Sequence, residues 1–167
     1  MGVRSLVNER ETRIQAFYAE LGPALLAYAR SILRDTAPAE DVLQQVFLKL
    51  LSNPALPLPT DARPYLFRAV RNTSLNVQRS TMRDAAHREG LELFTAPNGL
   101  SHLVPELEAA LDDLPDEQRQ VVILRIWGEL TLDETAEVLG IPANTAASRY
   151  RYALAKLRQR LGALVRS

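Results

Sequence analysis

The sequence predicts an all-α protein made of two small helical domains. Apolar residues recur at three- and four-residue steps, as in Phe17, Leu21, Leu25 and Tyr28, which is the spacing of one face of an α-helix. No clean alternation of apolar and polar residues, the pattern of a half-buried strand, appears along the chain. Clusters of proline, glycine and polar residues interrupt the helical pattern and divide the helices into two groups.

The interruptions also predict the domain boundaries. They lie at residues 35–38, 52–64 and 95–105. We expect a first domain at residues 10–90 and a second, which contains a helix-turn-helix, at residues 106–165. The polar linker between them, residues 91–105, contains glycine and proline, and we expect it to be flexible.

Composition excludes several kinds of site. The 167 residues include no cysteine, which excludes disulfides and thiolate zinc sites, and His87 and His102 lack the spacing of a metal centre. We therefore expect no metal, no cofactor and no small-molecule substrate. The N-terminus lacks the apolar core of a signal peptide, and no run reaches the length of a membrane span, so we expect a soluble, cytoplasmic protein without membrane contact.

Charge is sorted along the chain although the formal net charge is zero. Residues 62–83 carry five arginines and no acid, whereas residues 106–117 carry six acids and no base. From residue 141 to the end, six bases stand without an acid. The sequence thus predicts two basic surfaces separated by an acidic one.

The second domain carries the helix-turn-helix pattern. Thr131 and Glu134 fit a capping box, and the helix that they begin should end at Leu139. Gly140 suits the left-handed position after a helix, and Pro142 suits the first turn of the next one. Small, polar and cationic residues lead that next helix: Asn144, Thr145, Ser148, Arg149 and Arg151. Such a surface suits the major groove of DNA, although a solvated basic helix face would give the same pattern.

A second candidate surface lies in the first domain, at residues 64–80. Tyr65, Arg68, Asn72, Asn76 and Arg79 recur at helical steps and should share one face. The other stripe is mostly apolar and should pack on the preceding helices: Leu66, Ala69, Val70, Thr73 and Val77. An aromatic ring, two arginines and two amides in a row suit single-stranded bases, but an ordinary exposed helix face is an equal alternative.

Three segments in this order resemble one family. They are AEDVLQQVFLKLL (39–51), RPYLFRAVRNTSLN (63–76) and LDDLPDEQRQVVILRIWGELTLDETAEVLGIPANTAASRYRYALAKLRQRL (111–161). Together they resemble an extracytoplasmic function (ECF) sigma factor of the sigma-70 family, over residues 13–162. The resemblance implies a detachable initiation subunit that binds core RNA polymerase and directs it to promoters. The subunit would read the −35 element as duplex and the −10 element as melted single strand. It also implies that the polymerase performs the chemistry.

The resemblance nominates the polymerase-binding residues. In the family, the helix that matches residues 39–51 docks on the coiled coil of the clamp in the largest polymerase subunit. Carried onto this chain, the contact residues are Asp41, Gln44, Gln45, Phe47 and Leu48. Val46 and Phe47 are equally well explained as core residues.

The resemblance also nominates residues for the −10 element. The family reads this element as single strand, and the loop between the two helices, here residues 52–62, helps to form a pocket for one extruded base. The candidates are Asn53, Arg63, Tyr65, Arg68, Arg71, Asn72, Asn76 and Arg79. Many members have Trp where this chain has Tyr65, which offers a smaller stacking surface.

The candidates for the −35 element lie within the helix-turn-helix. They are Thr131, Asn144, Thr145, Ala147, Ser148, Arg149 and Arg151. Many members have Lys where this chain has Ala147, so we expect one basic contact fewer. Of the unusual neighbours Tyr150 and Tyr152, we expect one to pack inward, but the sequence does not assign which.

The expected partners are core RNA polymerase, promoter DNA and an anti-sigma factor. A dimeric helix-turn-helix regulator that acts without polymerase is the main alternative, but it would explain only residues 130–161. A structural adaptor that bridges partners through an apolar seam is another. We do not expect an enzyme, because the close acid pairs, Asp112–Asp113 and Asp133–Glu134, come without a nucleophile, a base or a phosphate loop.

Overall fold

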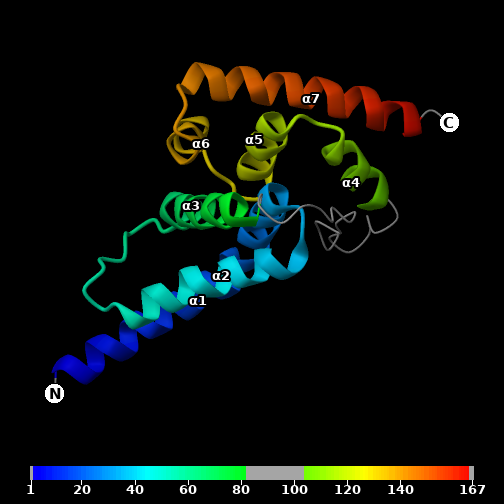
Figure 1. Ribbon diagram of the computed structural model, residues 1–167. Helices are drawn as coiled ribbons and strands as arrows, with labels where there is room; N and C mark the ends of the chain where they lie inside the picture. Colours follow the sequence, from blue (N-terminus) through cyan, green and yellow to red (C-terminus); the bar gives the residue numbers. More distant parts are fainter. Residues whose placement is uncertain (1, 82–103, 166–167) are drawn as a thin grey trace.

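The computed structural model describes residues 2–81 and 104–165, and within these ranges it contains helices and no strand (Figure 1). The helices are α1 (Gly2–Leu33), α2 (Thr36–Ser52), α3 (Arg63–Thr81), α4 (Val104–Asp112), α5 (Asp116–Ile126), α6 (Leu132–Leu139) and α7 (Ala143–Val165). The all-α prediction is confirmed. Residues 82–103, which hold His87, His102 and nearly all of the expected linker, lie outside the described residues.

Two helices extend past the expected domain boundaries. α1 starts at Gly2, whereas we placed the start of the first domain at residue 10, and it continues through Pro23. α4 starts at Val104, within the range that we assigned to the linker. In the part of the chain that the structure describes, no helix is long and apolar enough to cross a membrane.

Helices α1, α2 and α3 pack on one another. α2 begins after Asp35, whose carboxylate accepts a hydrogen bond from the Ala37 amide at 3.3 Å and so caps the helix. Leu25 of α1, Val42 of α2 and Leu66 of α3 are fully buried in the resulting core. The apolar stripe that the sequence predicted for α3 thus supplies buried contacts.

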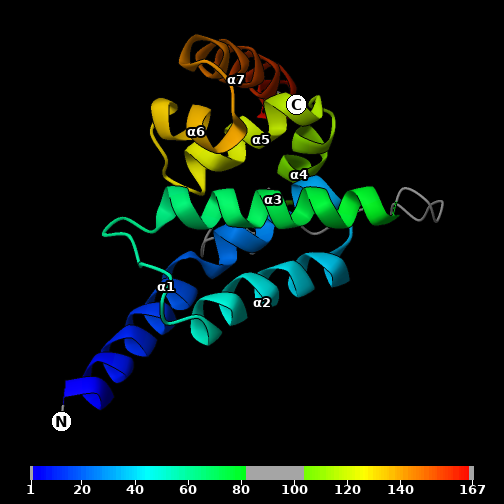
Figure 2. The same ribbon diagram turned by 60° about the vertical axis from the view of Figure 1, so that its left-hand side comes forward.

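The C-terminal helices form a smaller core of their own and also pack against the first three. Leu111, Leu114 and Leu157 lie in the smaller core, which joins α4, α5 and α7. α5 contacts α1, and α6 contacts α3. Figure 2 shows α4–α7 above α3, with α2 below it. The second group of helices therefore covers the side of α3 that faces away from α2.

A continuous apolar core joins the two groups of helices. Tyr28 and Phe67 from the first group lie in one cluster with Leu124 and Leu130 from the second, and all four are fully buried. A Cβ atom at Gly128 would lie 2.6 Å from the Leu124 carbonyl oxygen and 3.0 Å from the Phe67 ring, so only glycine fits this close approach. The sequence left the relative orientation of the domains open; the structure packs them together.

Candidate nucleic-acid interface

A groove of about 570 Å³ runs between α2 and α3. Its polar lining residues are Tyr65, Arg68, Asn72, Thr73 and Asn76 from α3 and Gln45 and Lys49 from α2. The helical spacing predicted that the four α3 residues other than Thr73 share a face, and they do. The fifth member of that stripe, Arg79, is exposed near the end of α3, beyond the residues that line the groove.

The groove offers the chemistry that a single-stranded base requires. Tyr65 is half-buried and supplies an aromatic ring, while the exposed amides of Asn72 and Asn76 supply donors and acceptors for base edges. Sequence reasoning missed Lys49, which adds a positive charge from the opposite wall. A signal for it existed, because Lys49 follows Gln45 by four residues and therefore lies on the same side of α2.

Other arginines of α3 point toward the C-terminal helices. Arg63 forms ion pairs with Glu20 at 2.8 Å and with Glu129 at 3.2 Å. Arg68, at the edge of the groove, lies 3.6 Å from the Glu137 carboxylate. The acids in these pairs are about two-thirds exposed, so each pair adds little to stability and can be exchanged for another anion.

Arg71 takes part in a buried polar contact between the two groups of helices. Its guanidinium and the Tyr28 hydroxyl both donate to the Gln120 side-chain oxygen, at 2.9 Å and 3.3 Å. Burial raises the pKa of Tyr28 to about 12, and the nearby Arg71 cation only partly opposes that shift. The structure therefore places Arg63 and Arg71 away from the groove that holds the other α3 candidates.

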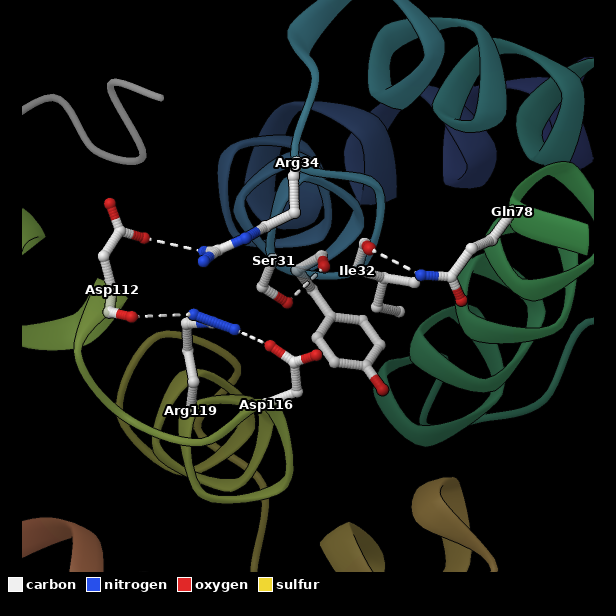
Figure 3. A network of polar contacts seen from close by, with 8 residues as sticks. Ser31, Ile32, Arg34, Gln78, Asp112, Asp116 and Arg119 are labelled. Atoms are coloured by element: carbon white, nitrogen blue, oxygen red, sulfur yellow. Dashed lines mark hydrogen bonds and ion pairs between the residues drawn. The ribbon is translucent and has the colours of Figure 1, made fainter. Parts of the chain in front are cut away.

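A second polar contact between the groups involves the acidic segment (Figure 3). Arg34, at the end of α1, pairs with Asp112 at 2.7 Å. Arg119 is fully buried beside it, donates to the Asp112 backbone carbonyl at 3.4 Å and contacts the Asp116 carboxylate. Burial lowers the pKa of Arg119 to about 10, and the neighbouring Arg34 cation contributes, so Arg119 stays charged at neutral pH.

Two of the other close acids also have structural partners. Asp113 pairs with Arg160 of α7, and Glu134 belongs to the cap of α6. Among residues 2–81 and 104–165, no group of three or more histidines and acids is arranged to hold a metal ion.

The helix-turn-helix forms as the sequence predicted. The Thr131 hydroxyl accepts from the Glu134 amide at 3.1 Å, and the Glu134 carboxylate accepts from the Thr131 amide at 2.8 Å. α6 ends at Leu139, and Gly140 has a left-handed φ of 65°. Pro142 differs slightly from the prediction, because it precedes the first helical residue of α7 rather than lying in the first turn.

The start of α7 presents a mixed surface. Asn144, Arg151 and, before α6, Thr131 are exposed, whereas Thr145, Ala147 and Ser148 are half-buried. Arg149 is also half-buried and pairs with Glu117 of α5 at 3.4 Å.

The two tyrosines beside these residues differ. Tyr150 packs inward, and the Arg125 guanidinium lies over the Tyr150 ring, 5.2 Å from the ring centroid. Tyr152 is 56% exposed, and Arg151 lies over its ring at 5.4 Å. The inward tyrosine is therefore Tyr150.

The polymerase contacts nominated on α2 differ in their exposure to solvent. Asp41, Gln44, Gln45 and Leu48 are exposed, but Phe47 is only 5% exposed and meets the edge of the Tyr18 ring at 5.1 Å. Val46 is buried as well, so of the two explanations for this apolar pair, the structure favours the core.

An apolar groove of about 410 Å³ lies beside these residues of α2. Tyr18 and Leu51, which sequence reasoning missed, line it together with Leu48, and all three are largely exposed. The spacing of Leu48 and Leu51 was the available signal, since residues three apart are neighbours on a helix.

Family models match both groups of helices. The Sigma-70 region 2 model matches residues 17–84, and the Sigma-70 region 4 model matches residues 110–159. The chain is 31% identical over 144 residues to the ECF RNA polymerase sigma factor EcfG of Rhodopseudomonas palustris, covering 81% of this chain and 77% of the relative. It is 31% identical over 141 residues to the RNA polymerase sigma-E factor of Streptomyces coelicolor, covering 83% and 80%.

Solved structures share the fold. The sigma factor RpoE of Bartonella quintana, in complex with the anti-sigma factor NepR, matches with a TM-score of 0.73 and 22% identity, over 89% of this chain and 95% of that one. CnrH, in complex with the cytosolic domain of CnrY, matches with a TM-score of 0.60 and 23% identity, over 96% and 94%. The chain belongs to the ECF sigma factors of the sigma-70 family, which are transcription initiation factors that bind RNA polymerase.

Proposed function

We propose that this chain reads the −10 element as single strand with α3 and the preceding loop, and the −35 element as duplex with the start of α7. The groove between α2 and α3 carries the proposal, because its two walls together present an aromatic ring, three amides and two cations. The chain contributes recognition, and the polymerase supplies the catalysis.

Phosphate contacts at the −10 element come from arginines of α3, one at the edge of the groove and others outside it. Arg68 and Arg63 hold exposed carboxylates in the compact structure, and such pairs contribute about 0–1 kcal/mol each. Phosphates of a bound strand can replace those carboxylates at little cost. Arg71 differs, because its partner Gln120 is shared with the buried Tyr28 hydroxyl. We assign Arg71 to DNA only where the C-terminal helices have moved away from α3.

Contacts at the −35 element come from the exposed residues at the start of α7. Asn144 and Arg151 face solvent in the compact structure and can approach a major groove without rearrangement. Arg149 has first to leave Glu117, an exposed acid 3.4 Å away. Thr131 supports the site from the first helix of the motif, where its hydroxyl is used by the capping box.

Domain roles and partners follow from these assignments. We assign residues 10–90 to polymerase and −10 binding and residues 106–165 to −35 binding, with α2 contacting the polymerase clamp through Asp41, Gln44 and Leu48. Both solved structures described above are complexes with an anti-sigma factor or a cytosolic domain of a second protein, which supports an anti-sigma factor as a partner here. A subunit that works with RNA polymerase acts in the cytoplasm.

The decisive experiment combines binding and transcription. Core RNA polymerase is incubated with the full chain, and run-off transcription is measured on a genomic promoter library with and without it. We expect binding to core and new, defined start sites. A chain that neither binds core nor initiates, yet shifts duplex DNA as a dimer, would instead be a helix-turn-helix regulator.

A further inference from the structure

The loop between α2 and α3, residues 53–62, has few hydrogen bonds of its own to fix its shape. Pro54, Pro57 and Pro59 have no N–H group to donate. Within the loop, the Leu56 amide donates to the Asn53 carbonyl at 3.1 Å. Figure 1 shows the loop on the same side of the molecule as the N-terminal half of α1. The carbonyl groups of the loop therefore need donors from another element.

Arg10 of α1 donates two hydrogen bonds to the loop and a third to the end of α2. Its guanidinium donates to the Leu56 carbonyl at 2.7 Å, to the Leu50 carbonyl at 3.0 Å and to the Asn53 carbonyl at 3.1 Å. Leu50 lies in the last turn of α2, where helix carbonyls have no intrahelical partner, and Asn53 is the C-cap. One half-buried side chain thus joins the end of α2 to the start of the loop.

The geometry requires the fork of an arginine. Its terminal nitrogens donate in different directions within one plane, whereas a lysine presents one compact ammonium group. The positive charge also lies at the C-terminal end of α2, where the helix dipole favours a cation. One turn further along α1, Arg13 donates to the Pro59 carbonyl at 3.3 Å. The two arginines hold the loop at both ends.

We propose that Arg10 is a positioning residue for promoter selection, which fixes the loop so that the Asn53 side chain meets the extruded base of the −10 element. The Asn53 backbone is held by Arg10 while its side chain is exposed, so the direction of that side chain depends on the contact. Because the guanidinium donates into the protein, Arg10 acts through the loop and does not touch DNA. This inference rests on the proposed role of the loop in reading the −10 element.

The test uses the full chain with core RNA polymerase on a promoter library randomised across the −10 element. Arg10→Ala and Arg10→Lys are compared with Glu11→Ala, an exposed neighbour on α1. We expect Arg10→Ala to reduce the preference for the favoured base at the captured position by about tenfold, the cost of one mismatch. Preference at the −35 element and affinity for core should stay as in the wild type. Arg10→Lys should recover only a minor part of the base preference that Arg10→Ala loses.

Several outcomes overturn the proposal. A uniform loss of transcription with the base preference intact makes Arg10 merely structural, and full recovery in Arg10→Lys shows that charge alone is needed. If Arg10→Ala does not fold, as judged by its melting temperature, Arg13→Ala serves instead, because it removes only the 3.3 Å bond at the far end of the loop. An unchanged preference in both Arg13→Ala and Arg10→Lys overturns the proposal.

The loop assignment is tested separately by Asn53→Ala. If this change leaves the −10 preference unaltered, the proposed reading of the −10 element by the loop fails, whatever Arg10 does. If it alters the preference and the arginine variants do not, only the positioning role fails.

Discussion

The two helices proposed to meet promoter DNA, α3 and α7, differ in how much of their surface the rest of the protein uses. α3 faces a groove on one side and packs against α6 on the other, and Arg63 and Arg71 already have partners among the C-terminal residues, Glu129 and Gln120. The start of α7 packs against its own group of helices and leaves Asn144 and Arg151 in solvent. Fewer of the proposed DNA contacts are therefore occupied by other residues at the start of α7 than on α3.

The largest effect should come from the buried side of α3. Phe67 is fully buried between the two groups of helices, edge-on to Tyr28 at 5.7 Å. Phe67→Ala removes those contacts and leaves a cavity, so we expect the free energy of unfolding to fall by about 3–5 kcal/mol in urea denaturation. Tyr152→Ala, on the exposed face of α7, should cost far less. Equal losses would mean that α3 is no more buried than α7.

The pH dependence of stability sharpens the same comparison. The pKa of Tyr28 is about 12 in the folded state and 10.0 when the ring is in water, so between these values the folded chain keeps a proton that the unfolded chain loses. The contribution of Tyr28 to stability is fully present below pH 10 and is lost as the pH rises toward 12, by up to about 1.4 kcal/mol per pH unit.

Tyr28→Phe isolates this contribution. The variant lacks the bond to Gln120 and should be less stable at pH 8, but it should lose stability less steeply above pH 10. Because the pKa of Arg119 is lowered in the folded state, its contribution to stability changes in the opposite direction in this pH range. That contribution is the same in both proteins, so it cancels in the difference between them. Parallel curves from urea unfolding at pH 8–11 would show that Tyr28 is not buried against the C-terminal helices.

The open side of α3 should affect promoter opening. Asn72 lines the groove and is exposed, so Asn72→Ala removes the proposed base contact without disturbing the core. We expect open-complex formation by the holoenzyme to fall about tenfold, while closed-complex binding to duplex promoter changes little. Permanganate footprinting measures the first, and a filter-binding assay at low temperature measures the second. Equal losses in both would place Asn72 on duplex rather than single-stranded DNA.

Local sequence patterns predicted the capping box at Thr131, the turn at Gly140 and the shared face of Tyr65, Arg68, Asn72 and Asn76, because each depends on residues within one or two turns. The same spacing places Arg71 about 100° around the helix from Asn72 and outside the shared face, although it does not show which neighbours of that face also line the groove.

Other features depend on contacts that local patterns do not encode. The partner of Arg71, Gln120, is 49 residues away in the sequence, and Arg10 meets carbonyls 40 to 46 residues away. Phe67 was not predicted as an inter-domain contact, because helical periodicity shows that a residue is apolar but not which element covers it.

The smallest effect should come from α7, where the proposed recognition requires only the Arg149–Glu117 ion pair to break. Arg149→Ala should reduce the slope of log affinity against log salt concentration by about one unit, because one phosphate contact and its released counterion are lost. Glu117→Gln should act in the opposite direction, since it removes the carboxylate that holds Arg149 at 3.4 Å and leaves the cation free for DNA. The pair is half-exposed, so the gain should stay within about 1 kcal/mol. Holoenzyme binding to a −35 duplex, titrated at several salt concentrations, measures both variants. If Glu117→Gln weakens binding as Arg149→Ala does, the acid orients Arg149 toward DNA instead of competing for it.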